Sequence, residues 1–138
     1  MTTAITPHLN FQGNARQALS FYHSVFGGEL SIVTYANAGK AEDASSPDDI
    51  MWGQVRNESG FRIMAYDVQT SKLWNPGENA VYMVLESNTT TELTGYWDKL
   101  AELAEILQPL LPSPWSSLYG MLKDNFGTVW VCSVASSE

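Results

Sequence analysis

The same short pattern occurs twice in this sequence, and the repeat constrains the fold more than any other feature. In each copy a polar residue lies three places before a glycine and separates two apolar runs: Asn57 precedes Gly60, and Asp124 precedes Gly127. The two glycines are 67 residues apart, about half the chain. Because a chain that repeats one supersecondary unit is expected to fold as two copies of it, the sequence predicts two modules of similar topology.

Hydrophobic periodicity predicts that the first module contains a strand, a helix and a meander of three strands. Apolar residues recur at helical spacing over residues 15–26. They follow Asn14, a residue type favoured at helix N-caps, and precede the glycine stop at 27–28. We interpret residues 36–49, which are polar and rich in helix and strand breakers, as a mobile loop of a length that is often functional. The expected strands are 5–12, 29–35, 50–56 and 61–67.

The second module is predicted to follow the same plan. Residues 79–86 form its expected first strand, and Thr89 and Glu92 make a capping box at the start of the second helix. A strand over residues 105–111 comes next. We expect residues 112–117 to leave the sheet as a loop, because proline donates no ladder hydrogen bond. The final hairpin brings the prediction to two helices and about eight strands.

Composition and charge exclude several classes of function. With 138 residues, of which 44% are hydrophobic, the chain can form one compact domain with a core. The net charge is −8 and the seven basic residues are scattered, which excludes nucleic-acid binding and disfavours binding to an anionic membrane surface. The sequence has neither a secretory signal nor the roughly 20-residue apolar run that crosses a bilayer. Cys132, the single cysteine, is predicted to be a buried structural thiol, so we expect a cytoplasmic protein.

Sequence motifs of the common enzyme classes are missing. The chain contains no Gly-rich phosphate loop, no pair of cysteines, no His-Glu-x-x-His and no Gly-x-Ser-x-Gly. The acidic residues of the 36–49 loop lack the alternating spacing and central glycine of an EF-hand, so a solvated loop is the better interpretation. The catalytic residues are therefore left unassigned.

Two segments carry a resemblance to a known family. Residues 5–28, with a Phe-Tyr helix that ends at a glycine, and residues 119–130, with their closing Asp-x-Phe-Gly-x-x-Trp, resemble the PhnB-like branch of the glyoxalase/bleomycin-resistance/dioxygenase superfamily, also called vicinal oxygen chelate. The resemblance implies an α+β fold. In it, two βαβββ modules in tandem form a curved, cup-shaped mixed sheet with helices on the outer face. The chain would be a single domain, with modules at about 4–67 and 79–135 and a linker at 68–78.

In the metal-dependent members of the superfamily, His, Glu or Gln side chains hold a divalent ion in the cup. The resemblance places these positions roughly at His8, at Tyr66 or Asp67, at Asn79 and at Val131. Valine cannot bind a metal and asparagine is a weak donor, whereas a catalytic ion needs about three good protein ligands. We therefore predict no cofactor. A divalent metal, if present, would use His8 and Asp67, although Asp67 at a strand end is also a typical turn residue.

The resemblance also implies a site for a small molecule inside an aromatic cup. The residues predicted to bind this ligand are His8, Trp52, Arg62, Trp115 and Tyr119. An arginine that faces an apolar cup would act as a clamp for an anion or a carboxylate. Structural alternatives exist for all five: a hydrogen-bonded histidine at a strand end, aromatic residues in the core or at a dimer contact, and an arginine at the surface.

Three functions compete, and we favour small-molecule binding without a metal. Trp52 stands where many PhnB-like relatives carry His, and residues 115–120 lack the acid and the arginine of the corresponding segment in those relatives. The alternatives are a metal-dependent lyase, isomerase or dioxygenase, and a module that acts through protein contacts. The methyltransferase name associated with this branch gains no support from a Gly-rich strand-turn-helix. A homodimer is expected on family grounds, because a partner would cover the edges of a half-open cup.

Overall fold

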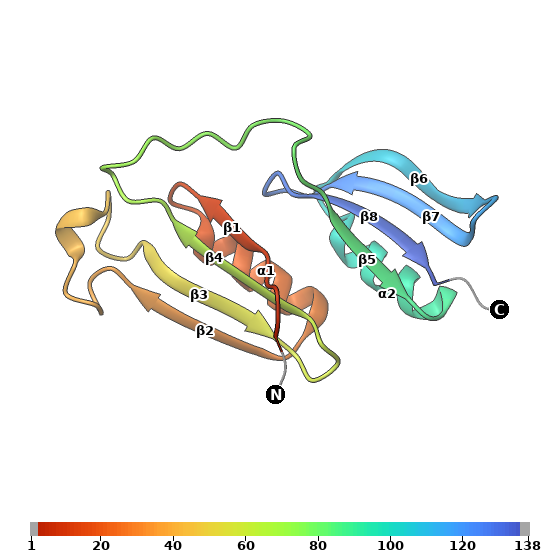
Figure 1. Ribbon diagram of the computed structural model, residues 1–138, viewed down its shortest axis with the longest axis horizontal. Helices are drawn as coiled ribbons and strands as arrows, with labels where there is room; N and C mark the ends of the chain where they lie inside the picture. Colours follow the sequence, from red (N-terminus) through yellow and green to blue (C-terminus); the bar gives the residue numbers. More distant parts are fainter. Residues whose placement is uncertain (1–2, 136–138) are drawn as a thin grey trace. The chain divides into compact units, whose positions relative to one another are not determined.

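The computed structural model describes residues 3–135, which form two compact units that divide between Pro76 and Gly77. The first unit contains β1 (His8–Phe11), α1 (Ala15–Phe26), β2 (Glu29–Thr34), a short 3-10 helix η1 (Ala41–Asp43), β3 (Ile50–Arg56) and β4 (Arg62–Asp67). The second unit contains β5 (Met83–Ser87), α2 (Thr90–Leu100), β6 (Glu105–Ser113), β7 (Ser116–Lys123) and β8 (Val129–Val134). Figure 1 shows the same sequence of elements in each unit.

Each unit is built on one four-stranded mixed sheet. The strand orders are β1-β4-β3-β2 and β5-β8-β7-β6, so both modules place their first strand beside their fourth. That pair is parallel in each unit, and the remaining pairs are antiparallel. The predicted α+β fold of two βαβββ modules is therefore confirmed.

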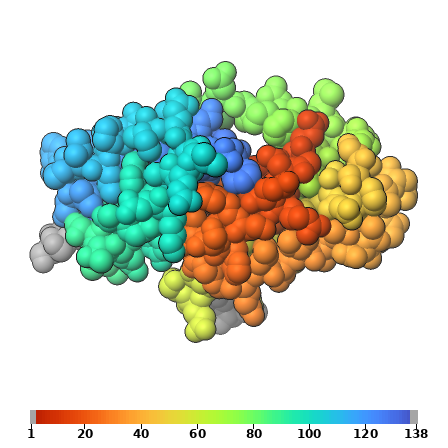
Figure 2. Space-filling view, turned by 180° about the vertical axis from the view of Figure 1, so that it is seen from behind, coloured from red at the N-terminus to blue at the C-terminus, as the bar shows by residue number. Residues whose placement is uncertain are grey.

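One face of each sheet is covered by the helix of the same unit, as the front and back views show (Figures 1 and 2). The predicted apolar stripe of α1 is confirmed, since its buried residues are Ala15, Ala18, Leu19, Tyr22, Val25 and Phe26. The strands present residues such as Val55, Ile63 and Ala65 to this helix, and each of them is fully buried. Burial of apolar surface on this face, at about 25 cal/mol per Å², holds each helix on its sheet.

The two helices pack against equivalent glycines. Gly53 on β3 and Gly120 on β7 each lie seven residues before their hairpin glycine. A Cβ atom at Gly53 would overlap Leu19 of α1, and a Cβ at Gly120 would lie 3.0 Å from the ring of Trp97 of α2. A residue without a side chain is therefore required where each helix approaches its sheet.

The two repeated turns, on which the prediction of tandem modules rested, have the same hydrogen bonds. The side-chain oxygen of Asn57 accepts from the amides of Ser59 and Phe61, at 3.1 and 3.0 Å. The carboxylate of Asp124 accepts from the corresponding amides two and four residues onward, at 2.9 and 3.0 Å. An Asx turn therefore fixes both hairpins.

Some predicted boundaries are wrong. The first strand begins at His8 rather than at residue 5, and the fifth begins at Met83 rather than at Asn79, whose φ of 58° is left-handed. Strand β6 continues through Pro112 to Ser113, where a loop was predicted. It is the outermost strand of its sheet and its pairing register shifts repeatedly. A proline at such an edge costs the sheet no hydrogen bond.

Within the described part of the chain, no helix is long and apolar enough to cross a membrane.

Candidate functional site

The face of the first sheet that lies opposite α1 is the candidate site, and we call it the open face. Alternate residues of a strand point to opposite sides of the sheet, so the pairing register assigns its members. His8 and Met64 form one pair, and Asn10 and Tyr66 form the next. The open face consists of His8, Asn10, Glu29, Ser31, Val33, Trp52, Gln54, Arg56, Arg62, Met64 and Tyr66, all of them exposed or half-buried.

His8 lies on β1, at the edge of the open face, and is exposed. Its Nδ1 is 2.9 Å from the side-chain oxygen of Asn10, and its ring meets that of Tyr66 edge-on, with centroids 5.2 Å apart. The hydroxyl of Tyr66 donates to Gln69 at 3.3 Å. These contacts orient the imidazole so that Nε2 is the nitrogen directed away from Asn10.

Trp52 lies on the same face as Gln54 and Arg56 by strand alternation, and a bulge in the β2–β3 pairing separates it from Ile50. The register shift between Val33 and Thr34 leaves Ile50 fully buried, with its amide bonded to Asp67, and leaves Trp52 half-buried beside Gln54. Bulges commonly redirect a side chain in this way. Three of the five predicted ligand-binding residues, His8, Trp52 and Arg62, therefore share one face of one unit.

Arg62 is held at the far end of the open face. Its Nε donates to the hydroxyl of Thr6 at 2.8 Å, and Arg56 stands opposite it on β3. The guanidinium of Arg56 is 3.8 Å from Glu29, and both of these side chains are largely exposed. Two arginines thus lie side by side on the surface of a protein whose net charge is −8.

Asp67 lies on the other face and has a structural role. It is 2% exposed, and its carboxylate accepts hydrogen bonds from the amides of Gly13, Ala15 and Ile50 at 2.8, 3.0 and 2.8 Å. The carboxylate thus caps α1 from a distant strand, next to the positive end of the helix dipole. Asn14 occupies the N-cap position as predicted, but its side chain makes no capping hydrogen bond.

Trp115 and Tyr119, the other two predicted residues, belong to the second unit. Trp115 lies at the β6–β7 turn and is 62% exposed, and its ring meets that of Tyr119 edge-on at 5.2 Å. Tyr119 pairs with Ser133, and Met121 pairs with Val131, on the face opposite α2. This face has an aromatic pair at one end and fewer hydrogen-bonding groups than the open face of the first unit.

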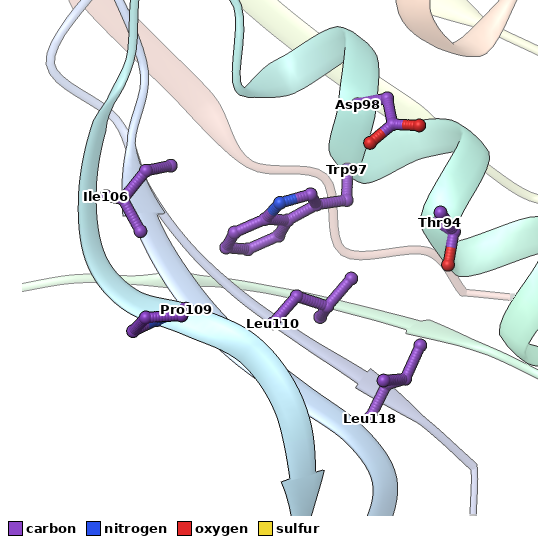
Figure 3. Close-up of a pocket in the computed structure, with 7 residues that line it drawn as sticks. All are labelled: Thr94, Trp97, Asp98, Ile106, Pro109, Leu110 and Leu118. Atoms are coloured by element: carbon purple, nitrogen blue, oxygen red, sulfur yellow. The ribbon is translucent and has the colours of Figure 1, made fainter.

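A concave region lies between α2 and the outer strands of the second sheet, and sequence reasoning missed it. Helix α2 packs chiefly on β8 and β5, which leaves a cavity of about 450 Å³ beside β6. Figure 3 shows the indole of Trp97 extending from α2 toward Ile106 and Pro109. The helical stripe predicted Trp97 as a core residue, and nothing in that pattern signals a cavity. The lining is Thr94, Trp97, Asp98, Ile106, Pro109, Leu110 and Leu118.

The family's metal positions can be tested against the strand register. In the first unit the register places Met64, rather than Tyr66 or Asp67, beside His8. In the second unit it places Val84, rather than Asn79, beside Val131. Neither pair by itself supplies the several nitrogen and oxygen ligands that a divalent ion needs. The described residues hold no group of three or more His, Cys, Asp or Glu arranged for a metal. His8 and Asp67, the two residues predicted to bind a divalent metal if one is present, lie on opposite faces of the sheet and therefore do not point toward a common ion.

Cys132 is fully buried on the helix side of the second sheet. Burial raises the pKa of its thiol from 9.0 to about 12. A thiol is nucleophilic as the thiolate, so Cys132 has the properties of a structural residue.

Fold and open face together define a glyoxalase-type protein whose two modules carry different surfaces. Residues 3–133 match the family described as 3-demethylubiquinone-9 3-methyltransferase, and the chain belongs to that family. It is 29% identical to protein PA1353 from Pseudomonas aeruginosa, with a TM-score of 0.85 over 99% of this chain and 100% of that one.

Two further structures share the fold, and the first of them is a PhnB protein. A putative 3-demethylubiquinone-9 3-methyltransferase, PhnB protein, from Bacillus cereus is 26% identical, with a TM-score of 0.77 over 96% of this chain and 100% of that one. A glyoxylase/bleomycin resistance protein/dioxygenase domain from Frankia sp. EAN1pec has the same fold, with a TM-score of 0.66 at 10% identity over 99% of each chain. The predicted resemblance to the PhnB-like branch is confirmed.

Proposed function

We propose that this protein binds a small molecule on the open face of its first unit and that binding requires no metal ion. The observation that carries the proposal is the contrast between the two faces of one sheet. The face toward α1 is apolar and buried, whereas the open face gathers an imidazole, an indole, a phenol and two guanidiniums. Such a mixture of aromatic surface and a few polar groups is typical of ligand sites.

The chemistry available on this face is recognition rather than covalent catalysis. His8 and Tyr66 offer hydrogen-bonding groups, Trp52 offers a flat apolar surface, and Arg62 offers a positive charge. A nucleophile with an adjacent base, the usual signature of covalent catalysis, is not formed by these residues. For the second unit, contact of Trp115 and Tyr119 with a ligand remains a prediction.

The methyltransferase named in the family description is not the activity that we propose. Nucleotide-type cofactors are commonly bound at a glycine-rich turn between a strand and a helix of a parallel sheet. In residues 3–135 both sheets are mixed rather than parallel. The turns that lead from β1 into α1 and from β5 into α2 are not glycine-rich turns of this kind. Asp67 reaches the start of α1 and Thr89 caps α2, at 3.1 Å from the amide of Glu92.

The first test is elemental analysis of protein purified without chelators or a metal-binding tag, together with thermal melts in the presence of divalent ions. We expect no stoichiometric metal and no change in melting temperature. His8→Ala is the informative variant, and His23→Ala on α1 is its matched control. Near-stoichiometric metal that is lost in His8→Ala but kept in His23→Ala would contradict the proposal and favour a metal-dependent lyase, isomerase or dioxygenase.

The second test is a fluorescence or calorimetric screen of small molecules with wild type and Trp52→Ala. We expect saturable, stoichiometric binding that Trp52→Ala weakens while the circular dichroism spectrum stays unchanged. Turnover of a bound compound would show instead that the protein is an enzyme.

We also propose that the protein forms a homodimer. Edge strand β6 carries exposed apolar side chains, with Leu107 at 44% and Leu111 at 58% exposure. An apolar edge strand is a surface that proteins normally cover. Light scattering coupled to size-exclusion chromatography is expected to give twice the mass of the chain. A folded monomer at micromolar concentration would contradict this proposal.

A further inference from the structure

We infer that Arg56 and Arg62 form a subsite for an oxyanion at one end of the open face. The ligand then carries a carboxylate or phosphate group about 13 Å from an aromatic or apolar part. This inference rests on the proposed function, and it specifies the chemical class of the ligand.

The two arginines lie close together on neighbouring strands. The amide of Asn57 donates to the carbonyl of Phe61 at 3.0 Å, so the neighbouring Arg56–Arg62 pair is of the non-hydrogen-bonded type. In such pairs the Cα atoms are about 4.5 Å apart and the side chains are close. Like charges in this position destabilise a sheet. A bound anion between the guanidiniums would convert the repulsion into attraction.

Arg62 is oriented by a hydrogen bond to Thr6. Because its Nε donates to Thr6, the guanidinium is fixed, and its two terminal nitrogens are the groups that can reach a ligand. A planar fork held in this way suits the two oxygens of a carboxylate or phosphate. Glu29 lies 3.8 Å from Arg56, but it is 79% exposed and therefore neutralises the pair only weakly.

The surface at this end is hollowed beside the two arginines. A cavity of about 280 Å³ lies between the segment before β1 and the β3–β4 hairpin, entirely within the first unit. Both arginines line it together with the neutral residues Thr6 and Asn57. The lining is Ala4, Ile5, Thr6, Arg56, Asn57, Gly60, Phe61 and Arg62, which includes no acidic residue.

The second unit provides an internal comparison. At the equivalent pair it has Lys123 opposite Val129, so only one cation lies there. The βαβββ scaffold therefore does not require two cationic side chains at this pair of positions.

The length of the ligand follows from the strand geometry. Trp52 and Arg56 are four residues apart on β3, and Arg62 and Tyr66 are four residues apart on β4. At 3.3–3.4 Å per residue, both intervals are about 13 Å. His8, Gln54 and Met64 lie between the two ends and can contact the middle of an elongated ligand.

The experiment uses a series of naphthylalkyl carboxylates and phosphates of increasing chain length, each paired with its uncharged amide or alcohol. Dissociation constants are measured by calorimetry for wild type, Arg62→Gln, Arg56→Gln and Trp52→Ala. The matched control is Arg16→Gln, which removes the same charge from α1. We expect the charged probes to bind roughly tenfold more tightly than the neutral ones, most tightly when the spacing is near 13 Å. Arg62→Gln abolishes this preference, and Arg16→Gln leaves it intact.

The outcomes separate the two proposals. If charged and neutral probes bind equally well and Trp52→Ala weakens both, the open face is a binding site but the oxyanion subsite is wrong. If Arg16→Gln reduces the preference as much as Arg62→Gln does, the effect is one of net charge, which also overturns the subsite. If no probe binds, or if binding is indifferent to Trp52→Ala, the proposed function itself fails on this face.

Discussion

The two modules agree in the residues that build the scaffold and differ in the residues that face away from the helices. Gly53 and Gly120 lie under their helices, Asn57 and Asp124 make the same turn, and Ala65 and Cys132 are both fully buried. Each of these pairs is separated by the same 67 residues as the hairpin glycines. Close packing tolerates small changes of volume only, and this explains the agreement.

On the sheet faces opposite the helices, equivalent positions of the two modules carry chemically different side chains. His8 of the first unit is replaced by Val84 in the second, and the Tyr66 position by Ser133. These side chains are partly exposed, so exchanging them costs the fold little. The difference shows that the scaffold is shared and that recognition, in our interpretation, is concentrated in the first unit.

The largest effect on stability is expected at Asp67, a buried position at which the two modules carry different residues. The equivalent residue is Val134, and Thr89 rather than an aspartate caps α2. Asp67→Asn places an amide N–H against at least one of the backbone donors that the carboxylate accepts from. We expect the free energy of unfolding to fall by about 3 kcal/mol. Chemical denaturation measures it, and the exposed Asp48→Asn serves as control. A loss below about 1 kcal/mol would contradict this role.

The equivalent glycines allow a direct comparison of the two helix–sheet contacts. Gly53→Ala is expected to cost about 2 kcal/mol, because the new methyl group overlaps Leu19, which is fully buried. Gly120→Ala is expected to cost about 1 kcal/mol, because β6 is an outer strand with an irregular register and can shift. Thermal and denaturant unfolding of both variants tests the order. The reverse order would show that the second contact is the tighter one.

Exchanging the turn residues tests how interchangeable the hairpins are. Asn57 donates its amide to the carbonyl of Phe26 at 3.1 Å, whereas Asp124 accepts from the indole of Trp130 at 2.9 Å. Both Asn57→Asp and Asp124→Asn keep the turn but lose this outer bond. The first sets a carboxylate against the carbonyl of Phe26, and the second can set an amide N–H against the indole N–H of Trp130. We expect each to lower the free energy of unfolding by about 1.5 kcal/mol. Variants with unchanged stability would mean that the outer bonds contribute nothing.

The smallest effect is a gain in stability at the end of α2. The first helix ends at Gly27, which has a φ of 72°, whereas after α2 the left-handed position is occupied by Leu103, with a φ of 59°. Leu103 is 84% exposed, so little packing is lost when it is replaced. Leu103→Gly is expected to raise the free energy of unfolding by about 0.5–1 kcal/mol, because glycine adopts this conformation without strain. Leu103→Ala, which keeps the strain, is the control and is expected to bring no gain.

Features that depend on neighbours in the chain could be predicted from the sequence. The apolar stripe of α1, the capping of α2 by Thr89 and the two Asx turns all involve residues within a few positions of each other. Proline at β6 was misjudged, because its cost depends on whether the strand lies inside a sheet or at its edge. That property belongs to the assembled sheet.

The candidate site shows the same division. His8, Trp52 and Arg62 could be nominated by residue type and family resemblance, but their presence on one face follows from the β1–β4 and β3–β4 registers. The Arg56–Arg62 pair and the cavity beside Trp97 were missed, because neither has a local signal in the sequence.

By itself, the sequence determined the tandem modules, the helix, the turns and the family, because periodicity, turn chemistry and motifs are written in consecutive residues. Only the tertiary structure decided that Asp67 caps a helix some fifty residues away, and which side chains share the open face. The physical reason is that hydrogen-bond partners across a sheet are set by register, and a shift of one residue would turn every side chain to the opposite face.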